Sequence, residues 1–183
     1  MEAFIEIFQE NPAASAFGML GFASQMIWPM FRAHRAIMSA QFAIGSSYGA
    51  HYALLEAWSG AGVAGIGAAQ SALAFLVGER PWFRWVGLMF LPAVAAICYA
   101  TWTGLPTLFA FAAVALIMVG RLQRNTLHLR IFLLAASPFA MGYDVLVGAA
   151  PALMGGILST VIAAVMLVRE IKANRESVDV SAT

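Results

Sequence analysis

The chain has 183 residues, of which 62% are hydrophobic and only 10% are charged. Soluble domains carry roughly 25% charged residues, so this composition excludes an ordinary soluble domain and leaves room for about seven membrane-spanning helices. The formal net charge of +1 gives no sign of a nucleic-acid partner, because the few charges follow the membrane sides rather than gathering into one patch.

The first ten residues place glutamates at a spacing of four among apolar side chains, with Glu2, Glu6 and Glu10 against Phe4, Ile7 and Phe8. This spacing favours a short amphipathic helix on the outer membrane surface, and a frayed acidic tail fits it equally well. No basic segment precedes an apolar run here, so we expect no secretory signal peptide.

Seven apolar stretches follow, and each is close to the length that a membrane-spanning helix needs. In chain order they cover 12–31, 36–58, 63–78, 85–102, 106–120, 131–147 and 152–168. The first three predict a three-helix bundle over 12–78, and the fourth predicts a linker helix over 85–102. The last three predict a second three-helix bundle over 105–168, and the polar segment 169–183 predicts a cytoplasmic tail that is disordered at its end.

The ten Lys and Arg fall into four clusters, and two apolar stretches separate each cluster from the next. They are Arg32 and Arg35; Arg80 and Arg84; Arg121, Arg124 and Arg130; and Arg169, Lys172 and Arg175. A chain that crosses a bilayer twice between clusters brings every cluster to one face, and the positive-inside rule makes that face cytoplasmic. We therefore expect the N-terminus outside and the C-terminus inside. The short turns without basic residues, such as 59–62, 103–106 and 148–151, are then outside.

The two predicted bundles share a weak internal repeat. A shift of 91 residues aligns 52–79 with 143–170 without gaps and gives nine identities, among them Tyr52 with Tyr143 and Glu79 with Glu170. Both units then run in the same direction, as in transporters built from parallel repeats. Coincidence among common apolar residues is the alternative explanation.

Polar side chains inside the apolar stretches are candidate functional residues, because polar groups in hydrocarbon are costly. Gln41, Tyr48 and Tyr52 form one stripe of the second stretch at helical spacing, and His51 flanks it beside Tyr48. His51 either binds a polar substrate or relays a proton, or it fixes helix packing through a hydrogen bond to a neighbouring span.

Three further polar residues complete the predicted substrate site. Gln70 is near mid-depth in the third stretch, and Ser137 and Asp144 share one face of the sixth. Asp144 is either a solvated interfacial carboxylate or a group that titrates or binds a cation in an outward cavity.

Two prolines are candidate hinges. Pro138 removes a backbone hydrogen bond inside the sixth stretch and is expected to kink it. Pro29 is either a hinge for alternating access or a plain helix end, since it stands three residues before Arg32.

The sequence contains no arrangement of residues typical of an enzyme, a metal centre or a cofactor site, so we expect none of these. The single Cys98 lies inside an apolar stretch and has no second cysteine with which to form an internal disulfide. We expect it to be a small residue of the core.

Part of the sequence resembles a known family. His34-Arg35, followed by His51-Tyr52-Ala53-Leu54-Leu55-Glu56-Ala57-Trp58-Ser59-Gly60-Ala61, resembles the YgjV-like bacterial inner membrane proteins, with the clearest similarity over 15–80. Those proteins carry basic residues after the first span, then a His-aromatic-x-Leu-Leu-Gly segment and a Gly-Ala turn. The resemblance implies the 3+1+3 layout of the SWEET and PQ-loop superfamily and a multi-pass location in the bacterial inner membrane.

The chain departs from these family patterns at several positions. Glu56 stands where the family has Gly, and Gln70 stands where the family has Arg. Pro29 lacks the adjacent Gln of PQ-loop proteins, and its counterpart in the repeat is Gly120. Sugar sites of the SWEET type use membrane-embedded Asn, and none of the apolar stretches contains Asn, so sugar transport is poorly supported.

Two functions fit these patterns. The first is a small polar solute transporter that works by alternating access, with the two bundles rocking about the polar residues named above. The alternative is a non-transporting membrane partner or assembly subunit of a larger complex, and a lipid-handling role is a minor third possibility. Expected partners are membrane lipid, a small-molecule substrate, and either a second copy of the chain or another membrane protein.

Overall fold

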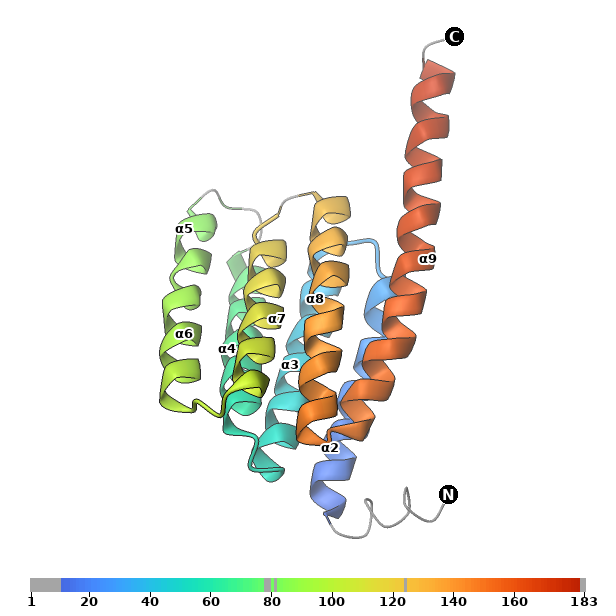
Figure 1. Ribbon diagram of the computed structural model, residues 1–183. Helices are drawn as coiled ribbons and strands as arrows, with labels where there is room; N and C mark the ends of the chain where they lie inside the picture. Colours follow the sequence, from blue (N-terminus) through green and yellow to red (C-terminus); the bar gives the residue numbers. More distant parts are fainter. Residues whose placement is uncertain (1–10, 78–79, 81, 124, 182–183) are drawn as a thin grey trace, which may run out of the picture.

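The computed structural model describes residues 11–77, 80, 82–123 and 125–181 of the chain. The predicted surface helix at 1–10 lies outside these residues. Every secondary-structure element of the described part is a helix (Figure 1). The helices are α2 (Pro12–Ile27), the 3-10 helix η1 (Trp28–Met30), α3 (His34–Leu54), α4 (Trp58–Val77), α5 (Phe83–Leu88), α6 (Phe90–Ala100), α7 (Leu105–Arg121), α8 (Thr126–Val147) and α9 (Ala150–Ser181).

Three of the helices are long and apolar enough to cross a membrane: α4, α8 and the part of α9 from Ala150 to Lys172. Two shorter helices are also apolar. One is Trp85–Ala100, which covers most of α5 and all of α6, and the other is α7. The all-helical class is therefore confirmed, and membrane-spanning length and composition are confirmed for three helices. The helix α3 has 21 residues, and it carries the polar stripe that makes it less apolar than the others.

Six of the described helices close into a ring. Within it, α3 packs between α2 and α4, α8 packs between α7 and α9, α4 contacts α7, and α9 returns to α2. The α5–α6 rod lies outside the ring, where α6 contacts α4 and α7 (Figure 1). The connections after α2 and α7 lie at one end of the bundle and those after α3, α6 and α8 at the other (Figure 1). The basic residues that begin α3 and end α7 therefore share one end, as the charge pattern predicts.

The turn predicted at 59–62 is in fact part of α4, and the chain turns earlier, at 55–57. Glu56 adopts a left-handed backbone conformation, with φ of 58°, which reverses the chain there. Gly60 serves close packing instead: a Cβ on it would lie 2.2 Å from the Tyr143 hydroxyl oxygen. Glycines that permit close helix contact and glycines that form turns look alike in a sequence.

Two other boundaries differ from the prediction. The loop predicted over 121–130 is much shorter, because Asn125 caps α8 by accepting a hydrogen bond from the Leu127 amide at 2.8 Å. The segment 169–181, predicted to be a tail with a disordered end, continues α9 as a helix through Ser181. The segment contains no Gly or Pro to end the helix.

Large apolar side chains face outward around the bundle, including Leu20, Leu76, Trp85 and Tyr99, which are 56%, 73%, 73% and 86% exposed. Such a surface is suited to contact with lipid. Four tryptophans are also exposed, as is typical of residues at a membrane interface: Trp58, Trp82, Trp85 and Trp102. Inside, Cys98 is buried in a core cluster with Val94 and Val114, as expected for a small core residue.

Candidate functional site

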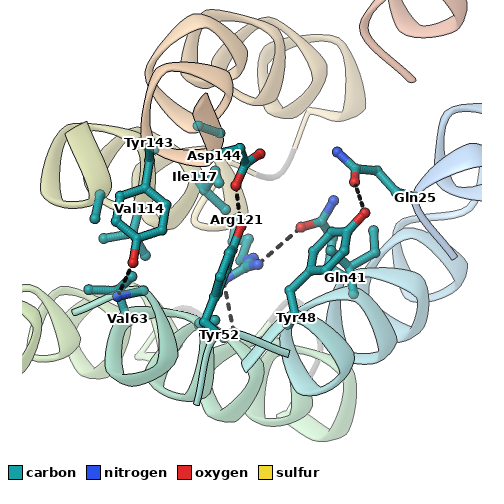
Figure 2. Close-up of a pocket in the computed structure, with 18 residues that line it drawn as sticks. Gln25, Gln41, Tyr48, Tyr52, Val63, Val114, Ile117, Arg121, Tyr143 and Asp144 are labelled. Carbon is teal, nitrogen blue, oxygen red and sulfur yellow. Dashed lines mark hydrogen bonds between the residues drawn. The ribbon is translucent and has the colours of Figure 1, made fainter. Parts of the chain in front are cut away.

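A cavity of about 150 Å³ lies inside the ring of helices. Its polar lining comes from both halves of the ring, with Gln25 on α2, three residues of α3, Arg121 on α7, and Tyr143 and Asp144 on α8 (Figure 2). The three residues of α3 are Gln41, Tyr48 and Tyr52, the stripe recognised in the sequence. Of the predicted site residues, the structure therefore brings four together here: Gln41, Tyr48, Tyr52 and Asp144.

Arg121 forms the layer of the cavity nearest the basic end. Its side chain is only 5% exposed and crosses from α7 to the opposite wall. Nη1 donates to the Gly67 carbonyl at 2.8 Å and lies 3.4 Å from Oε1 of Gln70, and Nη2 donates to Oε1 of Gln41 at 3.0 Å (Figure 2). All three acceptors are neutral amide oxygens, so the guanidinium joins α7 to α3 and α4 without an acidic partner among them.

A second layer connects α3 to α2. The Tyr48 hydroxyl donates to Oε1 of Gln25 at 2.5 Å (Figure 2). The Tyr48 ring is 6% exposed, so its hydroxyl is satisfied within the protein.

The third layer joins α3 and α4 to α8. The Tyr52 hydroxyl donates to Oδ1 of Asp144 at 2.5 Å, and Asp144 is 4% exposed. The Tyr52 and Tyr143 rings meet edge to face at 5.3 Å between centroids, and the Gly60 amide donates to the Tyr143 hydroxyl at 2.9 Å. Asp144 is thus not the solvated interfacial carboxylate that the sequence also allowed.

The layers are spaced by the helix that carries them. Gln41 and Tyr48 are seven residues apart on α3, and Tyr48 and Tyr52 are four apart, so the layers follow one another by about 10 Å and then about 6 Å. The result is a column of polar side chains along the cavity inside the ring of helices.

Ser137 lines a smaller neighbouring cavity of about 80 Å³, which shares Gln25 and Gln41 with the first. Its hydroxyl donates to the Leu133 carbonyl at 3.2 Å within α8. Ser159 of α9 also lines this cavity, so it extends the polar region towards the helices α8 and α9.

His51 and Gln70 are buried, and neither lines the main cavity. His51 Nδ1 lies 2.8 Å from the Ala14 carbonyl of α2, which is the packing contact that the sequence offered as an alternative to a substrate role. Gln70 supports Arg121 and also donates to the Gly87 carbonyl at 3.3 Å.

The two candidate hinges occupy different settings. Pro29 lies in η1, directly after the end of α2, and Pro138 lies inside α8 with an exposed side chain. The Pro29 carbonyl accepts a hydrogen bond from Arg130 Nη1 at 2.8 Å. A hinge role for Pro29 or Pro138 remains a prediction.

Arg130 lies close to the basic end. Its side chain is only 2% exposed, as little as many residues of the apolar core. Besides Pro29 it donates to the Phe31 carbonyl, and its Nε is 3.0 Å from Oε2 of Glu170 on α9. One side chain therefore ties α8 and α9 to the end of α2.

Sequence reasoning missed four residues of this interior: Arg121, Arg130, Gln25 and Tyr143. The two arginines were assigned to a cytoplasmic loop because their charge served as a topology marker. One signal was present: Gln41 and Gln70 are amides in apolar stretches, and buried amide oxygens need a donor from elsewhere in the chain.

A family model, Imp-YgjV, described as bacterial inner membrane protein, matches residues 12–174 of this chain. Searches of curated proteins and of solved structures find no match.

Proposed function

We propose that this chain, which belongs to the Imp-YgjV family of bacterial inner membrane proteins, moves a small polar solute across that membrane. The cavity carries the proposal. It lies between α2–α4 on one side and α7–α8 on the other, and both sides contribute polar side chains that are nearly inaccessible from outside. Buried polar groups in membrane helices commonly mark a solute or ion pathway.

The mechanism that fits is alternating access between two three-helix units, α2–α4 and α7–α9, with α5–α6 as the linker. The internal repeat supports this division. Adding 91 to the bounds of α3 (34–54) gives 125–145, against 126–147 for α8, and adding 91 to those of α4 (58–77) gives 149–168, where α9 begins at 150.

The packing of the helices supports the same division. Exchanging each helix with its counterpart in the repeat, α2 with α7, α3 with α8 and α4 with α9, carries the α2–α3 contact onto α7–α8, the α3–α4 contact onto α8–α9, and the α4–α7 contact onto α9–α2. Each contact of the ring therefore has a counterpart in the other unit. We propose accordingly a parallel 3+1+3 repeat, with the N-terminus outside and the basic end cytoplasmic.

Contacts join the two units at both ends of the cavity. Arg130 reaches from α8 to the Pro29 and Phe31 carbonyls at the basic end, and Tyr52 reaches from α3 to Asp144 at the other. Alternating access requires these two sets of contacts to break in turn while the solute stays between them. Pro29 is well placed to serve as a hinge, since it adjoins the first of them.

The test is solute flux through purified protein in liposomes, followed by stopped-flow light scattering with isobutyrate, isobutyramide, glycerol and glycine. We expect at least one solute to move faster than through protein-free liposomes. Val114→Trp, which fills the cavity from α7, should abolish that flux. The same change at Val165, which is 47% exposed on α9, should leave it intact.

Val114→Phe is a smaller replacement for the case in which the tryptophan variant does not fold. Flux that neither Val114 variant reduces would overturn the proposed pathway. A folded protein that moves none of the four solutes, and that purifies in a fixed ratio with a second membrane protein, would favour the alternative role as an assembly subunit.

A further inference from the structure

The positive charge of Arg121 has no negative partner at its own level of the cavity. Its side chain is 5% exposed, its three acceptors are amide oxygens, and its Nε–H has no hydrogen-bond partner among the described residues. An arginine stays charged in proteins, so this side chain brings a full charge into the protein interior.

The carboxylates of the described residues are positioned elsewhere. Asp144 is the one acidic side chain among the described residues that line the cavity, and its partner Tyr52 is 11 residues, about 16 Å, along α3 from Gln41. Glu170 is paired with Arg130. Neutral amide oxygens stabilise a buried cation less than an anion would. The side chain of Arg121 should therefore bind an anion that enters the cavity.

We propose that Arg121 binds the carboxylate of a small organic anion in this cavity. The inference rests on the proposed function, since it names the class of solute for the same site. A guanidinium presents N–H groups in a planar fork that matches a carboxylate, and the Nε–H of Arg121 is a buried donor without a hydrogen-bond partner in the part of the chain that the structure describes.

The cavity limits the rest of the ligand. Its volume of about 150 Å³ is similar to that of an engineered protein cavity that holds benzene, so the ligand has about six non-hydrogen atoms. Ile44, Val63, Val114 and Ile117 supply apolar wall around it. A second negative charge on the ligand would meet the Asp144 layer, which offers no cation. The expected class is therefore a compact monocarboxylate with an apolar body.

The test compares isobutyrate with isobutyramide, which has the same shape and size without the charge. Binding to the purified protein in detergent is measured by isothermal titration calorimetry, with inorganic phosphate as a third probe. We expect isobutyrate to bind at least about tenfold more tightly than isobutyramide, because it alone forms charge-assisted hydrogen bonds. Equal binding of the two, or binding of phosphate without isobutyrate, would overturn the assignment.

Substitutions locate the binding. Arg121→Lys keeps the charge without the fork and should weaken isobutyrate binding about tenfold or more, and Arg121→Gln should remove it. Arg80→Gln removes an exposed arginine and should change nothing. If Arg121→Gln does not fold, Arg121→Met takes its place. Isobutyrate binding that survives a folded Arg121 variant would overturn the proposal.

The two proposals fail separately. If isobutyrate binds in a way that depends on Arg121 but no flux is lost in Val114→Trp, the anion site is supported and transport is contradicted. If Val114→Trp abolishes a flux of glycerol or isobutyramide but isobutyrate does not bind, transport is supported and the anion site is contradicted.

Discussion

Arg121 and Arg130 are nine residues apart, and both are nearly inaccessible, at 5% and 2% exposed. Arg130 satisfies two main-chain carbonyls and pairs with the Glu170 carboxylate. Arg121 meets amide oxygens alone and forms part of a cavity wall. The comparison teaches that buried arginines close together in the chain serve different purposes: one is neutralised within the protein, and the other is left to a ligand.

Position in the fold explains this difference. Arg130 is in the second turn of α8 and faces the end of α2, where its contacts join α8 to α2 and α9. Arg121 is the last residue of α7 and faces inward across the ring. We therefore expect substitutions of Arg130 to affect mainly stability and those of Arg121 to affect mainly binding.

The largest loss of stability is expected from Arg130→Gln. It leaves the Pro29 and Phe31 carbonyls without their donor and Glu170 without its partner. Breaking a buried pair in this way typically costs about 3–5 kcal/mol, and the value here is expected at about 3 kcal/mol because Glu170 is 32% exposed. Unfolding in dodecylmaltoside micelles measures it, with the exposed Arg80→Gln as control. Equal stability of the two variants would contradict a structural role for Arg130.

A smaller loss, about 2 kcal/mol, is expected from Gln41→Leu. The substitution removes the acceptor of Arg121 Nη2, and hydrogen bonds to charged groups contribute about 1.5–3 kcal/mol. The control is the same change in an Arg121→Met background, where no charge remains to be satisfied. A double-mutant cycle measures the coupling, and equal losses in both backgrounds would show that Gln41 does not act through Arg121.

Glu170→Gln should cost less, at about 1 kcal/mol. The glutamine keeps the size of the side chain, and the lost charge is a third exposed, so solvent already screens it. The difference from the unmodified protein should shrink as salt is added, because salt screens the ion pair, which only the unmodified protein has. A loss as large as that of Arg130→Gln would instead place most of the stabilisation in the ion pair.

The polar interior was partly predictable from the sequence. Helical spacing grouped Gln41, Tyr48 and Tyr52 on one face of α3, and these three do line one cavity, because residues three, four and seven apart share a face. His51 precedes Tyr52 by one residue, and that rotation of about 100° turns it towards Ala14 of α2. Periodicity thus predicted which residues share a face of α3. It could not predict which neighbouring helix that face contacts.

Arg121 was beyond prediction for a different reason. A basic residue after an apolar stretch normally marks the cytoplasmic side, and its charge fitted that pattern. Its true setting depends on Gln41 and Gly67, which are 80 and 54 residues away in the chain. Contacts at such separations come from the packing of α3, α4 and α7, which local patterns do not specify. The boundaries at Glu56 and Asn125 were missed because single residues there decide where the chain turns.

Arg121→Met should have the smallest effect on stability, close to zero. Methionine fills much of the same space with an apolar side chain, and removing a buried charge that has no anionic partner among the described residues also removes its desolvation cost, which offsets the lost hydrogen bonds. The losses are the hydrogen bonds to Gly67, Gln70 and Gln41, and the gain is that no charge remains in the protein interior at this site. Unfolding in micelles should therefore resemble that of the unmodified protein, whereas stabilisation by isobutyrate should be absent. A loss of stability as large as that of Arg130→Gln would mean that both arginines are structural, because a residue reserved for a ligand is not needed to hold the ligand-free protein together.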